Sequence, residues 1–223
     1  MIFYDYWRSS SAWRVRIALN IKQISVERRA VNLAPDGGAQ HSAEFRALNP
    51  MSQVPVLVID EPPGPPRALT QSMAILEYLE ERFPSPPLLP ADPWLRARAR
   101  QLGEMVNAGI QPMQNLSLLQ RLHESGLAEP KDLARHHIAR GLGAIEAIAG
   151  ETAGAFLVGD LPTIADLYLI PQLYSGRRFD VDLSAFPRLL QVETACAALP
   201  AFTVAHPDVQ PDAPSASKSL PPV

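Results

Sequence analysis

Cysteine is almost absent from this chain of 223 residues, since Cys196 is its one example. A single cysteine cannot form an internal disulfide or a Cys-x-x-Cys redox pair, which excludes a dithiol oxidoreductase. Cys196 lies in an apolar run with helical periodicity, where we expect a packed, unreactive thiol rather than a nucleophile. This cysteine usage predicts a cytoplasmic protein.

The chain also lacks a strong charge of either sign, because 20 basic and 23 acidic residues give a formal net charge of −3. That balance provides no electrostatic basis for binding nucleic acid or an anionic membrane. No apolar run approaches the roughly 20 residues that cross a bilayer, and no secretory leader opens the sequence. The five histidines stand at no metal-ligand spacing, so no metal site is expected.

Residues 1–83 alternate between strand and helix signals. Strand patterns cover residues 2–6, 26–31, 54–59 and 68–70, and helical patterns cover residues 10–21, 42–48 and 72–83. The order strand, helix, strand, helix, strand, strand, helix predicts a thioredoxin-like α/β domain.

Proline, by contrast, is abundant, with 23 residues. Prolines interrupt residues 84–93 repeatedly, which predicts a linker there. Beyond it the strand signals vanish and apolar residues recur every three or four positions, so residues 94–223 are expected to form an all-helical domain. Its proline-rich end, residues 207–223, predicts a weakly ordered tail or a surface strap. Residues 61–67 look like a surface loop inserted between two strands.

A run of serines follows the first strand pattern and opens the first helix, in the sequence RSSSAWRVRIAL at residues 8–19. Hydroxyl groups at a helix start lie beside free backbone N–H groups and the positive end of the helix dipole, which together favour an anion. Such a site can hold a thiolate without a metal. The alternative is that Ser9 or Ser10 serves only as a helix cap.

Three further motifs stand at turns. Pro55 lies where thioredoxin-like domains keep a cis-proline, which would leave the backbone of Val54 available to pair with a bound peptide. The alternative, which the rarity of cis bonds favours, is an ordinary trans proline at the start of a strand. Ser72, after Gln71, is expected to be a helix N-cap whose neighbouring N–H groups can hold a carboxylate. Thr163-Ile164-Ala165-Asp166 is a capping-box pattern, so Asp166 is expected to be structural rather than catalytic.

Polar residues also mark the helical half. Gln111 and Asn115 are four residues apart, which places both amides on one helix face, and Pro112 would disturb that helix unless it lies at a kink or in the first turn. Arginine suits carboxylates because its planar fork binds them bidentately. The adjacent Arg177 and Arg178 are therefore candidates for binding a carboxylate, although adjacent arginines are most often solvated, and Arg8, just before the serines, is a further candidate.

In this order, the motifs resemble those of the zeta-class glutathione transferases, the family that includes the maleylacetoacetate isomerases. The resemblance runs from about residue 2 to residue 214 and includes GIQPMQN at residues 109–115 and QPDAP at residues 210–214. It implies the two-domain glutathione transferase fold, a homodimer, and glutathione as cofactor. One departure is Ser11, which stands where the family commonly has cysteine, so no covalent thiol role is expected there.

The resemblance also assigns roles to individual residues. Ser9, Ser10 and Ser11 would be catalytic by lowering the pKa of the glutathione thiol. Arg178 and Arg8 would bind the carboxylates of a diacid substrate. The implied glutathione-binding residues are Ser9, Ser10, Ser11, Ala12, Trp13, Arg14, Gln40, Val54, Pro55, Gln71, Ser72, Gln111, Asn115, Leu116 and Ser117.

The implied reaction is the isomerisation of maleylacetoacetate to fumarylacetoacetate by reversible thiolate addition, a step of tyrosine and phenylalanine catabolism. Two other activities remain open: maleylpyruvate isomerase, and a glutathione S-transferase that conjugates α-haloacids. A non-catalytic glutathione-fold binding protein is a further alternative, against which the intact thiol, γ-glutamyl and arginine positions argue.

Overall fold

The computed structural model describes residues 1–33, 38–61, 63–126 and 129–214. The chain divides into two units, of which the first comprises residues 1–86 and the chain from residue 200 onward, and the second comprises residues 87–199. We call residues 200–214 the return segment. Among the described residues, no helix combines the length and the apolar character needed to cross a membrane.

The first unit is built on a four-stranded sheet with the strand order β2-β1-β3-β4. β1 pairs with β2 in parallel, whereas β3 is antiparallel to both β1 and β4. The predicted order of strands and helices is confirmed. The elements are β1 Ile2–Asp5, α1 Ser10–Ile21, β2 Glu27–Ala30, α2 Ala43–Leu48, β3 Val56–Ile59, β4 Arg67–Thr70, α3 Ser72–Arg82 and α9 Pro200–Thr203.

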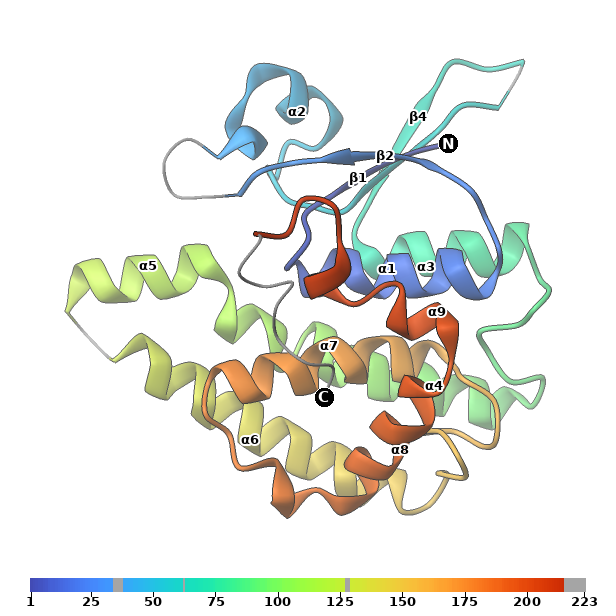
Figure 1. Cartoon of the computed structure of the whole chain (residues 1–223), viewed down its shortest axis with the longest axis vertical. Helices are drawn as coiled ribbons and strands as arrows, with labels where there is room; N and C mark the ends of the chain where they lie inside the picture. The colour runs from blue at the N-terminus through green and yellow to red at the C-terminus, as the bar shows by residue number, and fades with distance from the viewer. Residues whose placement is uncertain (34–37, 62, 127–128, 215–223) are drawn as a thin grey trace. The chain divides into compact units, whose positions relative to one another are not determined.

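Helices cover both faces of this sheet. α1 and α3 lie together on one side of the strands and α2 lies on the other (Figure 1). On the α2 side, Val56 and Val58 form a buried cluster with Phe45 of α2, and Ile2 packs against it. On alternate positions Phe3 and Leu57 are fully buried as well, as expected when successive side chains point to opposite faces. Residues 63–66, between β3 and β4, are exposed, and Pro62 of the predicted 61–67 loop lies outside the described residues.

The second unit is helical, as predicted. It contains α4 Pro93–Asn107, α5 Leu116–Ser125, α6 Pro130–Ala149, α7 Ile164–Arg178 and α8 Pro187–Ala197. α7 is the central helix, because it is buried along nearly its whole length and packs against α4, α6 and α8.

A capping box starts α7 and confirms the structural reading of Asp166. The Asp166 carboxylate accepts the N–H of Leu157 at 2.9 Å, the N–H of Thr163 at 2.7 Å and the Thr163 hydroxyl at 3.1 Å. Burial raises the pKa of Asp166 to about 6, while these hydrogen bonds act in the opposite direction.

The expected domain of residues 94–223 needs correction in its last part, because the return segment packs with the first unit. The side chain of Asn20 donates to the carbonyl of Ala201 at 3.1 Å, and Arg16 Nε donates to that of Ala205 at 3.0 Å. A helical period indicates that a segment has a buried face, but not which element covers it. Residues 215–223 of the predicted tail lie outside the described residues.

Candidate active site

Three turns of the first unit lie side by side at one edge of the sheet. Tyr4 pairs with Val56 and Val56 pairs with Thr70, so the end of β1, the start of β3 and the end of β4 are neighbours. The first turn, residues 6–9, is called the serine turn here; the second is Val54-Pro55 and the third is Gln71-Ser72. The sheet register therefore brings together motifs that are far apart in the sequence.

The serine turn starts α1 with Ser9 as the N-cap. Ser9 Oγ accepts the N–H of Ala12 at 3.2 Å, which confirms that this serine is a cap. A hydroxyl that accepts a hydrogen bond still has its own proton to donate, so capping leaves Ser9 able to donate to an anion. Ser10 and Ser11 are half-buried in the first turn of α1, where the helix dipole favours negative charge.

The next three residues of the motif, Ala12, Trp13 and Arg14, are buried. Arg14 Nη1 donates to Ser72 Oγ at 3.1 Å, a hydrogen bond that joins α1 to the first residue of α3. Arg14 is therefore placed to hold the third turn beside the serine turn.

The second turn has the predicted backbone, since the Val54-Pro55 peptide bond is cis. Asn49, which is 3% exposed, supports the loop before it. Its side-chain amide donates to the carbonyl of Gln53 at 2.7 Å, and its carbonyl oxygen accepts the N–H of Met51 at 3.1 Å. Asn49 was not singled out from the sequence, although an asparagine before proline signals a turn.

The third turn differs from the prediction that Ser72 is a helix N-cap. Gln71 occupies that position, with φ 70° and ψ 119°, and its side chain makes no capping bond. Ser72 is the first helical residue, and Arg14 engages its hydroxyl. Positive φ is costly for a residue other than glycine and is concentrated at functional sites, so this backbone marks the start of α3 as a candidate carboxylate site.

The side chain of Gln40 makes its hydrogen bond with a neighbouring residue and not with the three turns. It belongs to a short 3-10 helix, Ala39–His41, and its side-chain amide nitrogen is 3.3 Å from His41 Nε2. Across the described residues, no recorded hydrogen bond links Gln40 to the serine turn, Pro55 or Ser72. Its predicted role in glutathione binding stays a prediction.

In the second unit, Gln111 and Asn115 do not share one helix, contrary to the expectation of a common helix face. Gln111 begins a 3-10 helix that ends at Gln114, and Asn115 is the N-cap of α5. Pro112 sits in the first turn of that 3-10 helix, where a missing N–H costs little. Asn115 Oδ1 accepts both the N–H of Ser117 at 3.1 Å and its hydroxyl at 3.0 Å.

This segment is tied to α7 by a pair of amides. Gln114 donates to Gln172 at 3.0 Å and accepts from it at 3.2 Å, and Gln172 is 1% exposed. Leu116, the first residue of α5, is 51% exposed. Gln172 was missed from the sequence because a lone glutamine inside an apolar helix carries no positional signal.

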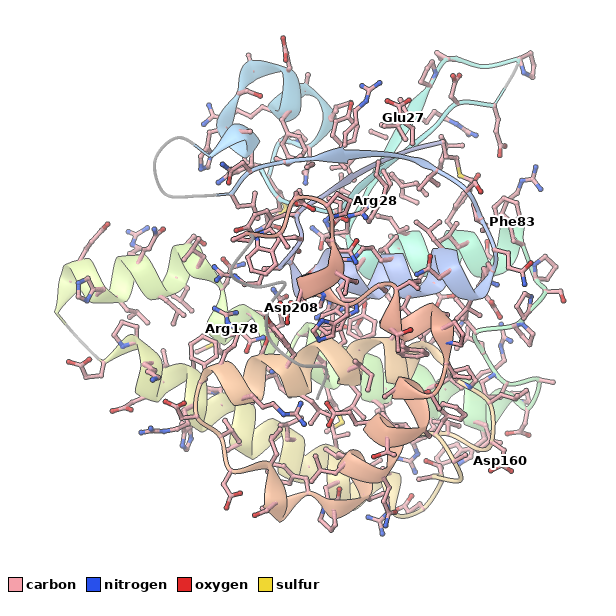
Figure 2. The ribbon with its side chains drawn as sticks, viewed as in Figure 1. Glu27, Arg28, Phe83, Asp160, Arg178 and Asp208 are labelled. Carbon is pink, nitrogen blue, oxygen red and sulfur yellow. The ribbon has the colours of Figure 1, made fainter. Side chains whose placement is uncertain are left out.

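The two arginines at the end of α7 differ in their partners. Arg177 forms a bidentate pair with Glu193, with both distances 2.6 Å. Arg178, the last residue of the helix, is exposed, and its guanidinium carbon lies 5.7 Å from the centre of the Phe179 ring (Figure 2). Arg8, in the first unit, is also exposed and lies 5.3 Å from the Trp7 ring centre.

Cys196 is buried in α8, as predicted. Burial raises the pKa of its thiol, and the nearby carboxyl groups of Asp166 and Glu193 raise it further. A thiol whose ionisation is suppressed in this way is a poor nucleophile. No group of three or more potential metal-ligating side chains gathers in the described part of the chain.

The edge of three turns matches the chemistry of glutathione. Ser9 and Ser10 offer hydroxyl donors at a helix start, which suit an anion such as a thiolate, and the Val54-Pro55 turn lies beside them at the same edge of the sheet. The start of α3 offers N–H groups for the γ-glutamyl carboxylate. These donors fit a thiol-containing peptide that carries carboxylates.

Comparison with known proteins points to the same ligand. Residues 8–82 match the family described as "Glutathione S-transferase, N-terminal domain", and residues 113–200 match "Glutathione S-transferase, C-terminal domain". Maleylacetoacetate isomerase of Rattus norvegicus is 47% identical over 214 residues, which cover 96% of this chain and 95% of the relative.

Solved structures similar to this chain belong to the same group of enzymes. Maleylacetoacetate isomerase from Anaeromyxobacter dehalogenans 2CP-1, with bound GSH in its active site, has 54% identity and a TM-score of 0.88, covering 96% of this chain and 97% of its own. A second structure of that protein contains dicarboxyethyl glutathione and citrate. A holo maleylpyruvate isomerase, described as a bacterial zeta-class glutathione S-transferase, has 40% identity and a TM-score of 0.89 over 96% of this chain and all of its own. The chain therefore belongs to the glutathione S-transferase family, in its maleylacetoacetate isomerase group.

Proposed function

We propose that this protein is a glutathione-dependent cis–trans isomerase that converts maleylacetoacetate to fumarylacetoacetate. The observation that carries the proposal is the sheet edge where the serine turn, the cis-proline turn and the start of α3 meet. That edge occurs in a chain that matches maleylacetoacetate isomerases over nearly its full length.

Glutathione, when bound, supplies a thiolate that adds reversibly to the cis double bond and so permits rotation about it. The protein's part is to keep the thiol ionised and in place. Ser9 and Ser10 donate hydroxyl hydrogen bonds to the sulfur at the start of α1, which favours the anion and lowers the pKa of the thiol. Val54 binds the cysteinyl backbone, and Gln71 and Ser72 receive the γ-glutamyl carboxylate at the start of α3.

Arginines provide the affinity for a diacid. Arg178 ends α7, and its exposed guanidinium can form a bidentate pair with a substrate carboxylate. Arg177 forms a bidentate pair with Glu193. The resemblance to the zeta class is what supports assigning Arg178 to the substrate. Arg8 is the second candidate for a carboxylate.

We further infer that the protein is a cytoplasmic homodimer acting in tyrosine and phenylalanine catabolism. The resemblance to the zeta class supports this inference. In that arrangement Gln111, Asn115, Leu116 and Ser117 border glutathione, partly across the dimer interface. We propose no nucleic-acid or membrane partner, because a formal net charge of −3 provides no electrostatic basis for one.

Maleylpyruvate is a second candidate substrate. A solved maleylpyruvate isomerase is as similar in fold as the maleylacetoacetate isomerases, with a TM-score of 0.89. The two substrates share the maleyl group and the carboxylates, so the residues assigned above serve either of them.

The test is to incubate purified protein with maleylacetoacetate, and separately with maleylpyruvate, with and without substoichiometric glutathione. We expect many turnovers of maleylacetoacetate to its fumaryl isomer per glutathione, and none without it. Faster turnover of maleylpyruvate would reassign the substrate. Binding of glutathione without any isomerisation would contradict the proposal and favour an α-haloacid transferase or a binding protein. A Ser9→Ala, Ser10→Ala double variant is the matched inactive control.

A further inference from the structure

The backbone of the serine turn is held by two side chains from other parts of the first unit. The N–H of Trp7 donates to Asp212 Oδ2 at 2.8 Å, across 205 positions of sequence. On the opposite side, Arg16 donates to the carbonyl of Trp7 at 2.9 Å and to that of Tyr6 at 3.3 Å. The carbonyl of Tyr6 in turn accepts the N–H of Ser9 at 3.0 Å. The peptide groups just before Ser9 are therefore fixed from both sides.

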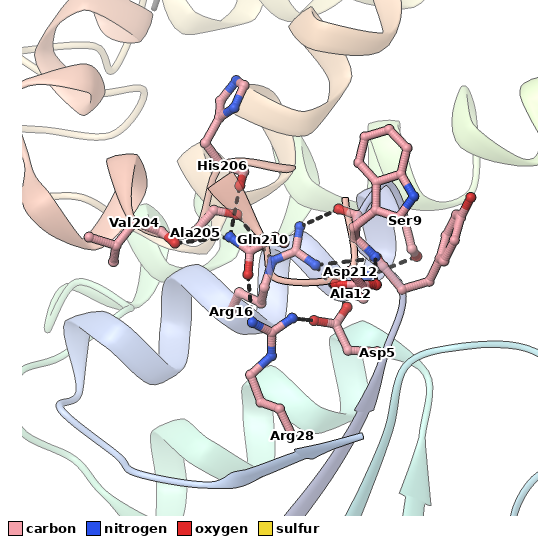
Figure 3. A network of polar contacts seen from close by, with 12 residues as sticks. Asp5, Ser9, Ala12, Arg16, Arg28, Val204, Ala205, His206, Gln210 and Asp212 are labelled. Carbon is pink, nitrogen blue, oxygen red and sulfur yellow. Dashed lines mark hydrogen bonds and ion pairs between the residues drawn. The ribbon is translucent and has the colours of Figure 1, made fainter. Parts of the chain in front are cut away.

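The return segment is folded so that Asp212 reaches the turn. Gln210, which is 2% exposed, donates its amide protons to the carbonyls of Val204 at 2.9 Å and His206 at 2.7 Å (Figure 3). Its carbonyl oxygen accepts Arg28 Nη1 at 2.5 Å. These bonds close residues 204–210 into a loop and attach it to β2.

Charged groups in the same cluster reinforce the arrangement. Asp5, 1% exposed, pairs with Arg16 at 2.8 Å and also with Arg28. Burial lowers the pKa of Arg16, and the charges of Asp5 and Asp212 oppose that effect. Asp212 thus acts on the serine turn in two ways, as the acceptor for Trp7 and as a countercharge for the arginine that holds the two carbonyls.

We propose that Asp212 is a positioning residue for the thiol-activating serines. Its carboxylate fixes the peptide group of Trp7, and α1 starts only three residues later with Ser10. Loss of this contact frees the turn to shift Ser9 and Ser10 relative to the sulfur, and a displacement of about 1 Å at a reacting group can cost about 100-fold in rate. The proposal rests on the proposed function, since it names a residue that supports the same site.

The experiment compares Asp212→Ala, Asp212→Asn and a control, Asp60→Asn. Asp60 is an exposed carboxylate that follows β3 in the same unit, so its substitution makes the same change in charge. Three quantities are measured: hydrogen exchange of a peptide spanning residues 4–13 without glutathione, the pKa of the enzyme-bound glutathione thiol from its ultraviolet absorbance, and kcat with KM for the diacid.

We expect Asp212→Ala to speed exchange of the peptide about tenfold, the scale of one lost hydrogen bond. The same variant should raise the pKa of the bound thiol by about one unit and lower kcat about tenfold, with KM for the diacid nearly unchanged. Asp212→Asn keeps an acceptor oxygen and should restore much of the loss. Asp60→Asn should match the unaltered protein in all three quantities.

If Asp212 has a purely structural role, Asp212→Ala should lower Tm but leave both the hydrogen exchange of the peptide and the pKa of the bound thiol unchanged. That result would overturn the positioning role. It would leave the proposed function intact. Failure of the unaltered protein to bind glutathione would overturn the proposed function and the thiol part of this inference together. The exchange data would then still decide whether Asp212 holds the serine turn.

Discussion

Arg14 of α1 and Ser72 of α3 are joined by a hydrogen bond of 3.1 Å between Nη1 and Oγ, and neither residue is more than 4% exposed. The bond links the two helices whose starts are assigned to two different groups of glutathione, the thiol and the γ-glutamyl carboxylate. An arginine that holds a serine in this way couples the position of one ligand group to that of the other. The coupling can be tested from the Ser72 side.

Ser72→Ala is expected to weaken glutathione binding about tenfold and to lower the free energy of unfolding by about 1–2 kcal/mol, because Arg14 loses an acceptor inside the protein. Isothermal titration and chemical denaturation measure the two effects. Ser25→Ala, at an exposed position of the same unit, is the control and should change neither. Unaltered glutathione affinity in Ser72→Ala would exclude the third turn from the binding site.

Alanine substitutions at Ser9 and Ser10 should separate the effect on stability from the effect on catalysis. Ser9 is the N-cap of α1, so Ser9→Ala should lower the free energy of unfolding by about 1 kcal/mol and also reduce turnover. Ser10 lies inside the helix, where Ala has a higher propensity, so Ser10→Ala should leave the stability within about 0.5 kcal/mol and reduce turnover alone. Paired denaturation curves and initial rates check this division. Full activity in both variants would remove the serines from the mechanism.

Asp166→Asn should destabilise the second unit by about 2–4 kcal/mol, because the amide nitrogen faces donors that the carboxylate oxygen accepts. The cost should also depend on pH. The folded pKa of about 6 lies above the ordinary value of 3.8, so the folded state binds this proton more tightly than the unfolded state. The protonated Asp166 carboxyl makes its full contribution to the free energy of unfolding below about pH 4. That contribution is lost as the pH rises through about 6.

The difference in free energy of unfolding between the unaltered protein and Asp166→Asn should therefore grow by about 1 kcal/mol when the pH falls from about 7 to about 5. Denaturation at the two pH values measures it. A difference that stays constant or shrinks on acidification would contradict the raised pKa and favour a carboxylate stabilised by its three hydrogen bonds.

Arg178→Ala is expected to raise KM for the diacid about 10- to 100-fold, the range for losing a charge-assisted hydrogen-bonded pair, with little change in Tm. Arg177→Ala provides the contrast, because it breaks the pair with Glu193 and should lower Tm while sparing KM. Steady-state kinetics and thermal denaturation of both variants decide the assignment. Equal KM values for Arg178→Ala and the unaltered protein would move the carboxylate site to Arg8.

Much of the secondary structure could be predicted from local patterns. The predicted bounds of α1 hold at residues 10–21, and Ser9 and Asp166 have the expected capping roles, because apolar periodicity and caps act within a few residues. The cis bond before Pro55 was expected from resemblance to a known fold rather than from the residues themselves.

The sequence-based predictions were wrong or incomplete mainly where a residue far away in the sequence determines the local structure. Ser72 has the propensity of an N-cap, yet its hydroxyl is engaged by Arg14, 58 positions earlier, and Gln71 takes the cap with a positive φ. Asn115 caps α5 rather than continuing one helix from Gln111. Asp212 was noted only as part of the QPDAP motif, and its role could not be predicted because its partner, the N–H of Trp7, is 205 positions away.

The return segment also constrains the order in which the protein can be assembled during synthesis. A ribosome releases the amino-terminal part of a chain first, and domains often fold as they emerge. Here Arg16 finds its acceptor at Ala205, and Trp7 finds its own at Asp212. The first unit is therefore the first to be translated and the last to be completed, and a nascent chain that stalls inside the helical unit lacks the acceptors that Ala205 provides to Arg16 and Asp212 provides to Trp7.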